Sequence, residues 1–194
     1  KAAVSTLNLG NPGWEGRALE LIAPETNLFL WLGSPVYALH PVPPVEAFFG
    51  WLPDLNGQAF AVPFVTWGSV TSGTALWEMG LALEANGFQL AGAAAFPARH
   101  SSMWQSEQPL GAGRPDAKDK TELAGLVRKV LSELSKGAPS GVSSKVLDYQ
   151  PESVKEFAGE LDIEKSRQKH PGFRFDQDLC TQCGICRDSC PAGA

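Results

Sequence analysis

Cysteine is absent before residue 180 of this 194-residue chain, and long apolar runs and basic blocks are absent throughout. A membrane span needs roughly 18 consecutive apolar residues. The longest apolar runs, residues 28–32 and 59–65, are short enough to be buried strands. The N-terminus shows no signal-peptide pattern. The net charge is −5, which argues against nucleic acid as the main partner. We therefore expect no membrane insertion and no nucleic-acid binding.

Common catalytic signatures are also missing. There is no G-x-S-x-G or G-K-[ST] motif, and the acidic residues are scattered, so hydrolase and nucleotide-triphosphate chemistry have no support. The hydrophobic fraction of 43% is close to the globular average and allows a real core. With 20 glycines and 15 prolines, the chain should be rich in loops. It starts with Lys1 rather than methionine, and we expect it to be a piece of a longer protein.

All four cysteines lie in one stretch near the C-terminus, spaced C-x2-C-x2-C-x3-C and followed by Pro191; they are Cys180, Cys183, Cys186 and Cys190. Clustered cysteines with none elsewhere indicate metal ligation in a reducing compartment, so we expect a cytoplasmic protein. Three thiolates at i, i+3 and i+6 suit three corners of a [4Fe-4S] cluster. A structural zinc site is the alternative, but zinc sites usually combine ligands across a longer spacer. The spacing favours iron and sulfur.

Strand-like and helical segments alternate in the first half of the chain. Strands are predicted at residues 18–22, 27–33, 59–65 and 88–96, and helices from Pro43 and over 74–85. Short loops between alternating elements predict an α/β fold with an open parallel sheet and flanking helices. Further helices are expected over 120–134 and 151–165, separated by a linker at 137–144.

Two loops are placed where such sheets bind ligands, beyond the carboxyl ends of the strands. They span residues 34–41 and 66–73. Tyr37 and Trp67 would flank a planar cofactor there, or else pack on the core. Ser69 and Ser72 would bond its edge, or else cap the next helix. His100 follows the last strand and is better explained as a surface or capping residue.

These loops carry a family resemblance. Ser34-Pro-Val-Tyr37-Ala38, the proline-rich helix start after it, and Thr66-Trp67-Gly68-Ser69-x-x-Ser72-Gly73 resemble the flavin-facing loops of flavodoxin-like domains. Such a domain followed by the cysteine run resembles the flavodoxin–ferredoxin fusion proteins of bacteria. The resemblance implies electron transfer between FMN and one or two [4Fe-4S] clusters, with redox proteins as partners. The implied flavin contacts are Ser34, Pro35, Tyr37, Thr66, Trp67, Gly68, Ser69 and Gly73.

The family pattern also assigns the cysteines. Cys180, Cys183 and Cys186 would bind one cluster, and Cys190 would serve a second. No second cysteine run follows, so this piece alone should bind iron poorly. Family members begin with a strand and a phosphate-binding loop, which residues 1–16 lack. Because that first strand is central in the order 2-1-3-4-5, we expect a gap in the sheet.

The resulting domain scheme has three parts. Residues 1–110 form a flavodoxin-like domain that lacks its N-terminal part, 111–172 a helical and linker region, and 173–194 a ferredoxin-type 4Fe-4S domain that is incomplete at its C-terminus. One alternative is an iron–sulfur module on a flavodoxin-like scaffold that no longer binds flavin. Another is an NAD(P)H-dependent flavin reductase, for which no nicotinamide fingerprint is present. An electron carrier is favoured over a substrate-specific enzyme.

Overall fold

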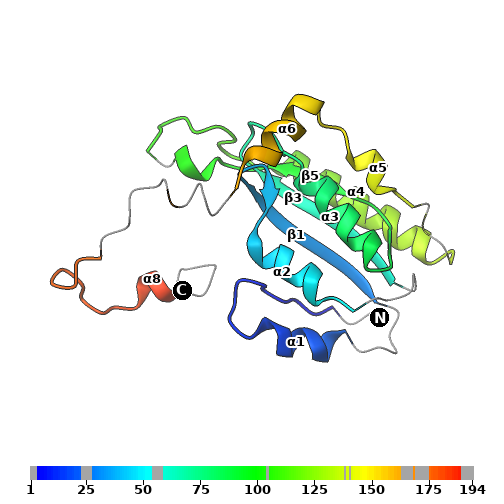
Figure 1. Ribbon diagram of the computed structural model, residues 1–194, viewed down its shortest axis with the longest axis horizontal. Coiled ribbons are helices and arrows are strands. Elements are labelled where there is room, and N and C mark those ends of the chain that lie inside the picture. Colours follow the sequence, from blue (N-terminus) through cyan, green and yellow to red (C-terminus); the bar gives the residue numbers. More distant parts are fainter. Residues whose placement is uncertain are drawn as a thin grey trace. The chain divides into compact units, whose positions relative to one another are not determined.

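The computed structural model describes residues 4–22, 28–53, 59–103, 105–137, 139, 141–162, 168 and 175–188. Contacts divide the chain into two compact units. One is Asn27–Ile163, which contains the sheet (Figure 1), and the other combines Lys1–Thr26 with Glu164–Ala194. Among the helices of the described residues, none has both the length and the apolar character required to cross a membrane.

The sheet is built on four parallel strands. Strand β1 (Phe29–Tyr37) pairs with β3 (Ala59–Trp67) over a register that runs from Phe29 opposite Phe60 to Pro35 opposite Thr66. On its other side β3 pairs in parallel with β4 (Phe88–Leu90) and then β5 (Ala94–Pro97). The strand predicted over 88–96 is therefore interrupted, and the mainly parallel sheet is confirmed. The predicted gap is wrong, because β1 lies directly beside β3.

Residues 18–22 do not form the predicted strand. Residues 18–21 belong to helix α1 (Trp14–Leu21), which starts after Gly13 in the left-handed region with φ 73°, and Ile22 is its C-cap. The N–H of Ile22 donates to the carbonyl of Ala18 at 2.8 Å, which closes the last helical turn. The alternation that suggested a strand covers five residues, whereas Trp14 and Ala18, both buried, stand at helical spacing. A five-residue segment is too short to distinguish the two-residue period of a strand from the 3.6-residue period of a helix.

The predicted loop 34–41 is largely regular structure. Strand β1 continues to Tyr37 and turns back through a two-residue hairpin into β2 (His40–Pro41), which pairs antiparallel with it. The two turn residues, Ala38 and Leu39, have positive φ angles of 48° and 72°. Such turns usually carry glycine or asparagine, so this hairpin has no recognisable sequence signature.

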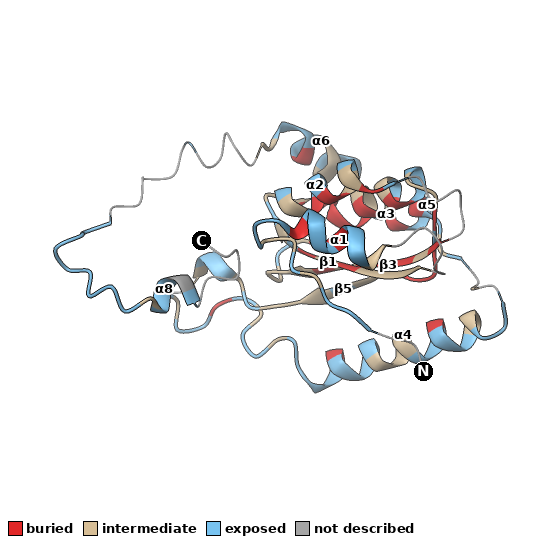
Figure 2. Cartoon of the chain, turned by 90° about the horizontal axis from the view of Figure 1, so that it is seen from below, coloured by how far each residue is buried: buried red, intermediate tan, exposed pale blue. Residues whose placement is uncertain are grey.

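Helices cover both faces of the sheet, as predicted (Figure 2). Helices α2 (Pro43–Trp51), α3 (Ala75–Ala85) and α5 (Ser144–Leu147) lie on one face. Proline at the start of α2 costs no hydrogen bond, because the first N–H groups of a helix have no intrahelical partner. Each of these two longer helices buries an apolar face: Val45 and Phe48 of α2, and Leu76, Met79 and Leu83 of α3.

Helix α4 (Ala117–Leu134) covers the opposite face. Its Val130 is fully buried in a cluster with Val62 of β3 and Ala91. Five partly buried side chains pack against this cluster: Phe29, Trp31, Phe60, Leu126 and Leu134. The predicted helix over 120–134 is confirmed, but its apolar side chains are only partly covered, because Leu123 and Leu131 remain 39% and 54% exposed.

The predicted linker 137–144 is packed against the sheet unit at its C-terminal end. The N–H of Val142 donates to the carbonyl of Leu90 at 2.9 Å, and the N–H of Ser144 donates to Glu84 of α3 at 2.9 Å. Ser143 then caps α5. Helix α6 (Glu152–Glu160) follows, shorter than the predicted 151–165. The remaining described elements are a 3-10 turn at Ser101–Met103 and helix α8 (Ile185–Asp188).

Candidate functional site

The cysteine loop begins with a turn made by Asp176. Its side chain accepts hydrogen bonds from the N–H groups of Asp178 at 3.0 Å and Leu179 at 3.4 Å. The N–H of Cys180 donates to the carbonyl of Gln177 at 3.3 Å. Aspartate favours such turns because its side chain bonds backbone amides two residues ahead. The turn therefore fixes the backbone just before the first thiol.

Left-handed residues separate the successive cysteines. Gln182 has a φ of 56° and Gly184 a φ of 76°, so the chain reverses between Cys180 and Cys183 and again before Cys186. Cys186 lies in α8, whose single turn is closed by the N–H of Asp188 donating to the carbonyl of Gly184 at 2.9 Å. A left-handed glycine costs little, because glycine has no Cβ.

The three described thiols are exposed and unpaired with one another. They share an open hollow of about 470 Å³ with Phe175, Leu179 and the intervening backbone. The N–H of Gln182 donates to Cys180 Sγ at 3.4 Å. The backbone N–H of Ile185 and the side chain of Thr181 both bond Cys183, and they lower the pKa of its thiol. These donors favour the thiolate, which is the form that binds metal.

The donor set fits an iron–sulfur cluster. Soft thiolates that accept hydrogen bonds from N–H groups suit iron–sulfur clusters. The thiols line an open hollow, which suits a cluster with several metal ions. Among the described residues, no three Cys, His, Asp or Glu side chains are close enough to hold a single metal ion. Cys190 lies outside the described residues, so the predicted four-cysteine set stays a prediction.

Residues 173–194 match the family model of the 4Fe-4S binding domain, Fer4. This match supports a [4Fe-4S] cluster and iron–sulfur electron transfer at this end of the chain. No curated protein and no solved structure matches the chain. The matched residues include the whole cysteine run.

The two loops predicted to hold a cofactor meet at the carboxyl edge of the sheet. The N–H of Thr74 donates to the carbonyl of Leu39 at 2.9 Å, and its hydroxyl donates to the same oxygen at 3.3 Å. Gly73 lies so close to the hairpin that a Cβ there would be 2.2 Å from that oxygen. The β1–β2 hairpin and the β3–α3 loop therefore form one structure.

Among the β1 residues predicted to contact flavin, Ser34 uses its hydroxyl for hydrogen bonds within the fold. Its hydroxyl donates to the carbonyl of Pro35 at 2.8 Å and accepts from the N–H of Val42 at 3.1 Å, at the start of α2. The side chain is buried. Pro35 and Tyr37 are exposed, Tyr37 to 49%. Tyr37 is therefore available to a ligand, whereas the Ser34 hydroxyl is engaged.

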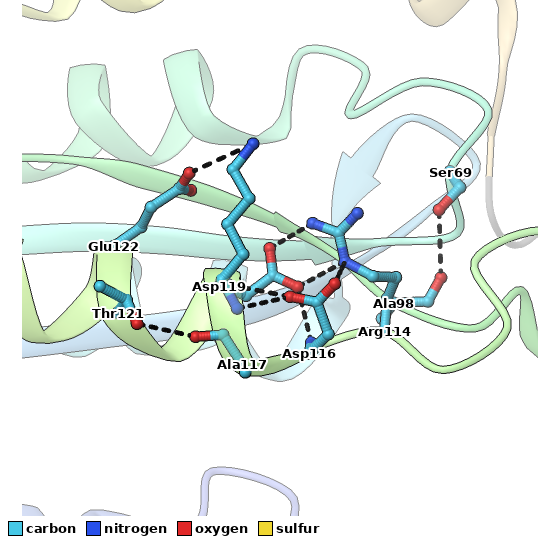
Figure 3. A network of polar contacts seen from close by, with 9 residues as sticks. Ser69, Ala98, Arg114, Asp116, Ala117, Asp119, Thr121 and Glu122 are labelled. Atoms are coloured by element: carbon cyan, nitrogen blue, oxygen red, sulfur yellow. Dashed lines mark hydrogen bonds and ion pairs between the residues drawn. The ribbon is translucent and has the colours of Figure 1, made fainter.

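The residues assigned on β3 and the following loop are half-buried, except Gly73, which is buried. The indole Nε1 of Trp67 is buried and has no hydrogen-bond partner among the described residues. His100 lies against Gly68, where a Cβ would be 2.8 Å from its ring. Ser69, with a φ of 63°, donates to the carbonyl of Ala98 at 3.4 Å (Figure 3). Thr66 lies in β3, paired with Pro35.

Sequence reasoning missed a segment that packs against these loops. The hydroxyl of Tyr149 is 2.7 Å from that of Ser72, and the amide of Gln150 donates to Ser72 at 3.1 Å. His40, in the hairpin, bonds Glu78 of α3 and the carbonyl of Ala158 in α6. The sequence separations are 77 residues for Ser72–Tyr149 and 118 for His40–Ala158. No local pattern could have revealed either pair.

A charged cluster at the start of α4 is structural. Arg114 donates to both carboxylate oxygens of Asp119, and the N–H of Asp116 donates to Asp119 at 2.8 Å (Figure 3). Asp116 in turn accepts from the N–H groups of Lys118 at 2.7 Å and Asp119 at 3.1 Å. This reciprocal capping satisfies free N–H groups of the helix. The cluster thus stabilises α4, and its charges are paired within the chain.

Proposed function

We propose that this protein transfers electrons between FMN and [4Fe-4S] clusters, as a flavodoxin-like domain joined to a ferredoxin-type domain. The observation that carries the proposal is the Fer4 match over a loop whose three described thiols are exposed around one hollow. A bound [4Fe-4S] cluster supplies one-electron redox chemistry at such a site. Redox proteins are the proposed partners, and the reducing cytoplasm is the proposed location, because all the cysteines are grouped in one metal-binding pattern.

The chain's own residues would bind the cluster and tune its electronics. Cys180, Cys183 and Cys186 would ligate it, with Cys190 as the fourth thiolate or as a ligand of a second cluster. The N–H donors to Cys180 and Cys183 would stabilise negative charge on sulfur. Hydrogen bonds to sulfur and solvent exposure are two of the factors that set the reduction potential of such clusters.

The flavin half of the proposal rests on the carboxyl edge of the sheet. In open parallel sheets ligands bind beyond the carboxyl ends of the strands, and here two loops meet at that edge with Tyr37 exposed. An aromatic ring in that place offers a stacking surface to a planar ligand. Trp67 presents a buried indole N–H that has no partner in the described structure.

The second candidate is an iron–sulfur module on a flavodoxin-like scaffold without flavin. The engagement of Ser34 and Ser72 favours it, because both hydroxyls already bond groups of the chain. In this case the sheet domain would serve to dock redox partners. The two candidates share the cluster and differ in flavin content.

The test is cofactor analysis of the protein at its full natural length, purified without oxygen. We expect iron and inorganic sulfide in similar amounts, a broad thiolate-to-iron absorption band, and FMN. Iron without FMN supports the second candidate, and a colourless protein that contains zinc overturns both.

Two substitutions make this test specific. Cys183→Ser should remove iron and leave FMN, and Tyr37→Ala should weaken FMN binding about tenfold, the worth of one aromatic stacking contact, and leave iron. Each variant controls for misfolding of the other. Loss of both cofactors in either variant would contradict the assignment of separate sites.

A further inference from the structure

A segment between α5 and the end of α6 lies across the carboxyl edge of the sheet (Figure 1). We name residues 148–161 the strap. Hydrogen bonds attach the strap near both of its ends, and between them Lys155 lies over the ring of Trp77 in α3, 5.9 Å from its centroid. Near its start, Tyr149 and Gln150 bond Ser72 of the β3–α3 loop, and near its end the carbonyl of Ala158 lies 2.9 Å from Nε2 of His40 in the hairpin.

The His40 attachment requires a charged imidazole. Its Nδ1 lies 2.8 and 3.1 Å from the two carboxylate oxygens of Glu78, and its Nε2 faces the Ala158 carbonyl. All of these oxygens are acceptors, and a neutral imidazole has a single N–H. Only the doubly protonated ring can donate to both sides. The Thr74 hydroxyl donates to Glu78 Oε1 at 2.5 Å and holds the carboxylate in place.

Two carboxylates and one backbone carbonyl, from three helices, act on the His40 ring. Burial of the ring lowers its pKa, but the Ala158 carbonyl of α6, Glu78 of α3 and Glu46 of α2 together raise that pKa above the usual histidine value. Ala158 lies in the last turn of α6, and its carbonyl also accepts a hydrogen bond of 3.0 Å from the N–H of Leu161. A cation there also interacts favourably with the negative end of the helix dipole.

We propose that a proton on His40 fastens the strap to the carboxyl edge of the sheet, and that loss of this proton releases α6. When one proton leaves, the remaining N–H stays on Nδ1, because the negative charge of Glu78 faces that nitrogen. The lone pair of Nε2 then faces the Ala158 oxygen, and the contact becomes repulsive. The contact to α6 is lost, whereas the contact to α3 is kept.

The direction of the pH dependence follows from the charge. The folded-state pKa of His40 is raised, so the contact stabilises the strap fully below the histidine reference value of about 6.5. The stabilisation is lost as the pH rises through the higher folded-state pKa. Release of α6 would uncover the hairpin around His40, while the bonds of Tyr149 and Gln150 to Ser72 stay in place. The inference does not depend on whether flavin or iron is bound.

Hydrogen exchange of the backbone amides of α6, followed by mass spectrometry from pH 6 to 9, tests this inference on the whole protein. Rates are divided by the intrinsic rate at each pH, and α4 serves as the internal reference. We expect α6 protection to fall about tenfold across the transition, as for loss of a cation at a helix C-terminus, with α4 unchanged.

Three variants distinguish the contact between His40 and Ala158 from a general effect of pH on the stability of the protein. His40→Gln should give low α6 protection that is independent of pH. Glu78→Gln keeps a polar side chain and removes the charge, so it should move the midpoint to lower pH. His100→Gln is the matched control, since His100 bonds Ser102 in another loop, and it should keep the wild-type profile.

Two results would overturn the inference. One is α6 protection that does not change with pH in the wild-type protein. The other is an unchanged midpoint in Glu78→Gln, which decides the question even where His40→Gln does not fold.

Discussion

The backbone N–H of Thr74 donates a hydrogen bond of 2.9 Å to the carbonyl oxygen of Leu39, and this contact joins the two loops at the carboxyl edge of the sheet. Leu39 has a positive φ of 72° in the hairpin turn, and Gly73, next to Thr74, has a φ of 56°. Two left-handed residues therefore meet at one contact. The close approach depends on the missing Cβ of Gly73, because a Cβ would lie 2.2 Å from the Leu39 oxygen.

Gly73→Ala should destabilise the sheet unit by about 2–4 kcal/mol, which combines left-handed strain with backbone overpacking. Gly113→Ala is the matched control, because Gly113 has a φ of 76° but nothing within 4 Å of its Cβ position. It should cost about 1 kcal/mol, from conformation alone. Urea unfolding followed by tryptophan fluorescence measures both. Equal losses of unfolding free energy in the two variants would show that the close contact between Gly73 and Leu39 does not add to the cost of the substitution.

Cys183 should react with iodoacetamide at a lower pH than an ordinary cysteine. In the metal-free protein its thiol pKa is lowered, first by the N–H of Ile185 and then by the side chain of Thr181. The thiolate is the reactive form. The pH of half-maximal alkylation, read by peptide mass spectrometry, should lie below that of the same protein in urea, and Thr181→Val should move it upward. A Thr181→Val profile identical to wild type would exclude the hydroxyl as a cause.

Acid should remove the contribution of Asp119 to stability. Hydrogen bonds from Arg114 are the main cause that lowers the pKa of Asp119 to about 2. A carboxyl group with a lowered folded-state pKa stabilises above its unfolded value near 4, and this contribution is lost as the pH falls toward 2. Asp119→Asn should therefore lower the Tm at pH 7, and the difference from wild type should shrink between pH 4 and 2.

Asp116, the other acidic residue bonded to Arg114 and Asp119, supplies the control for the Asp119→Asn experiment. Asp116→Ala removes the N-cap of α4 and should cost about 1 kcal/mol at pH 7. The pKa-lowering contacts of Asp119 with Arg114 remain in that variant. A Tm difference for Asp119→Asn that stays constant down to pH 2 would contradict the role of its ionised form.

The sequence predicted elements whose signals are local. Two prolines followed by Val45 and Phe48 at helical spacing identify α2, and Asn86-Gly87 marks the end of α3, where Gly87 has a φ of 80°. The apolar run from Ala59 predicts β3, because a strand covered on both faces carries little polar alternation. In the cysteine run the spacing of the thiols is itself the signal.

Several of the features that the sequence did not predict depend on contacts between residues far apart in the chain. The helix at 14–21 was misassigned because five residues satisfy both a period of 2 and a period of 3.6. Residues 141–144 read as linker by composition, yet Ser144 bonds Glu84, 60 positions away. The flavin assignment of Ser34 and Ser72 came from their place in the loops. Their hydrogen-bond partners, Val42 and Tyr149, follow from the folded structure and have no signal in the sequence.

The Ser72–Tyr149 contact at the start of the strap yields the last prediction. The two hydroxyls are 2.7 Å apart, and Ser72 is 6% exposed whereas Tyr149 is 51% exposed. A hydrogen bond of this kind contributes about 1 kcal/mol. Tyr149→Phe should destabilise by roughly that amount, and Ser72→Ala by more, because it also removes the bond from Gln150. The double variant should cost little more than Ser72→Ala alone, because both changes remove the Ser72–Tyr149 bond. The coupling energy from urea unfolding should be about 0.5–1.5 kcal/mol.

Tyr37, the other tyrosine of the chain, supplies the control cycle. Tyr37→Phe removes a hydroxyl at the same edge of the sheet, and Ser72 bonds Tyr149 and Gln150 instead. Ser72→Ala and Tyr37→Phe should therefore add without coupling. Coupling of equal size in both cycles would mean that Ser72 acts through the general packing of the edge. Coupling confined to Tyr149 means that the strap is attached by this bond, and Ser72→Ala should then also lower the exchange protection at the start of the strap.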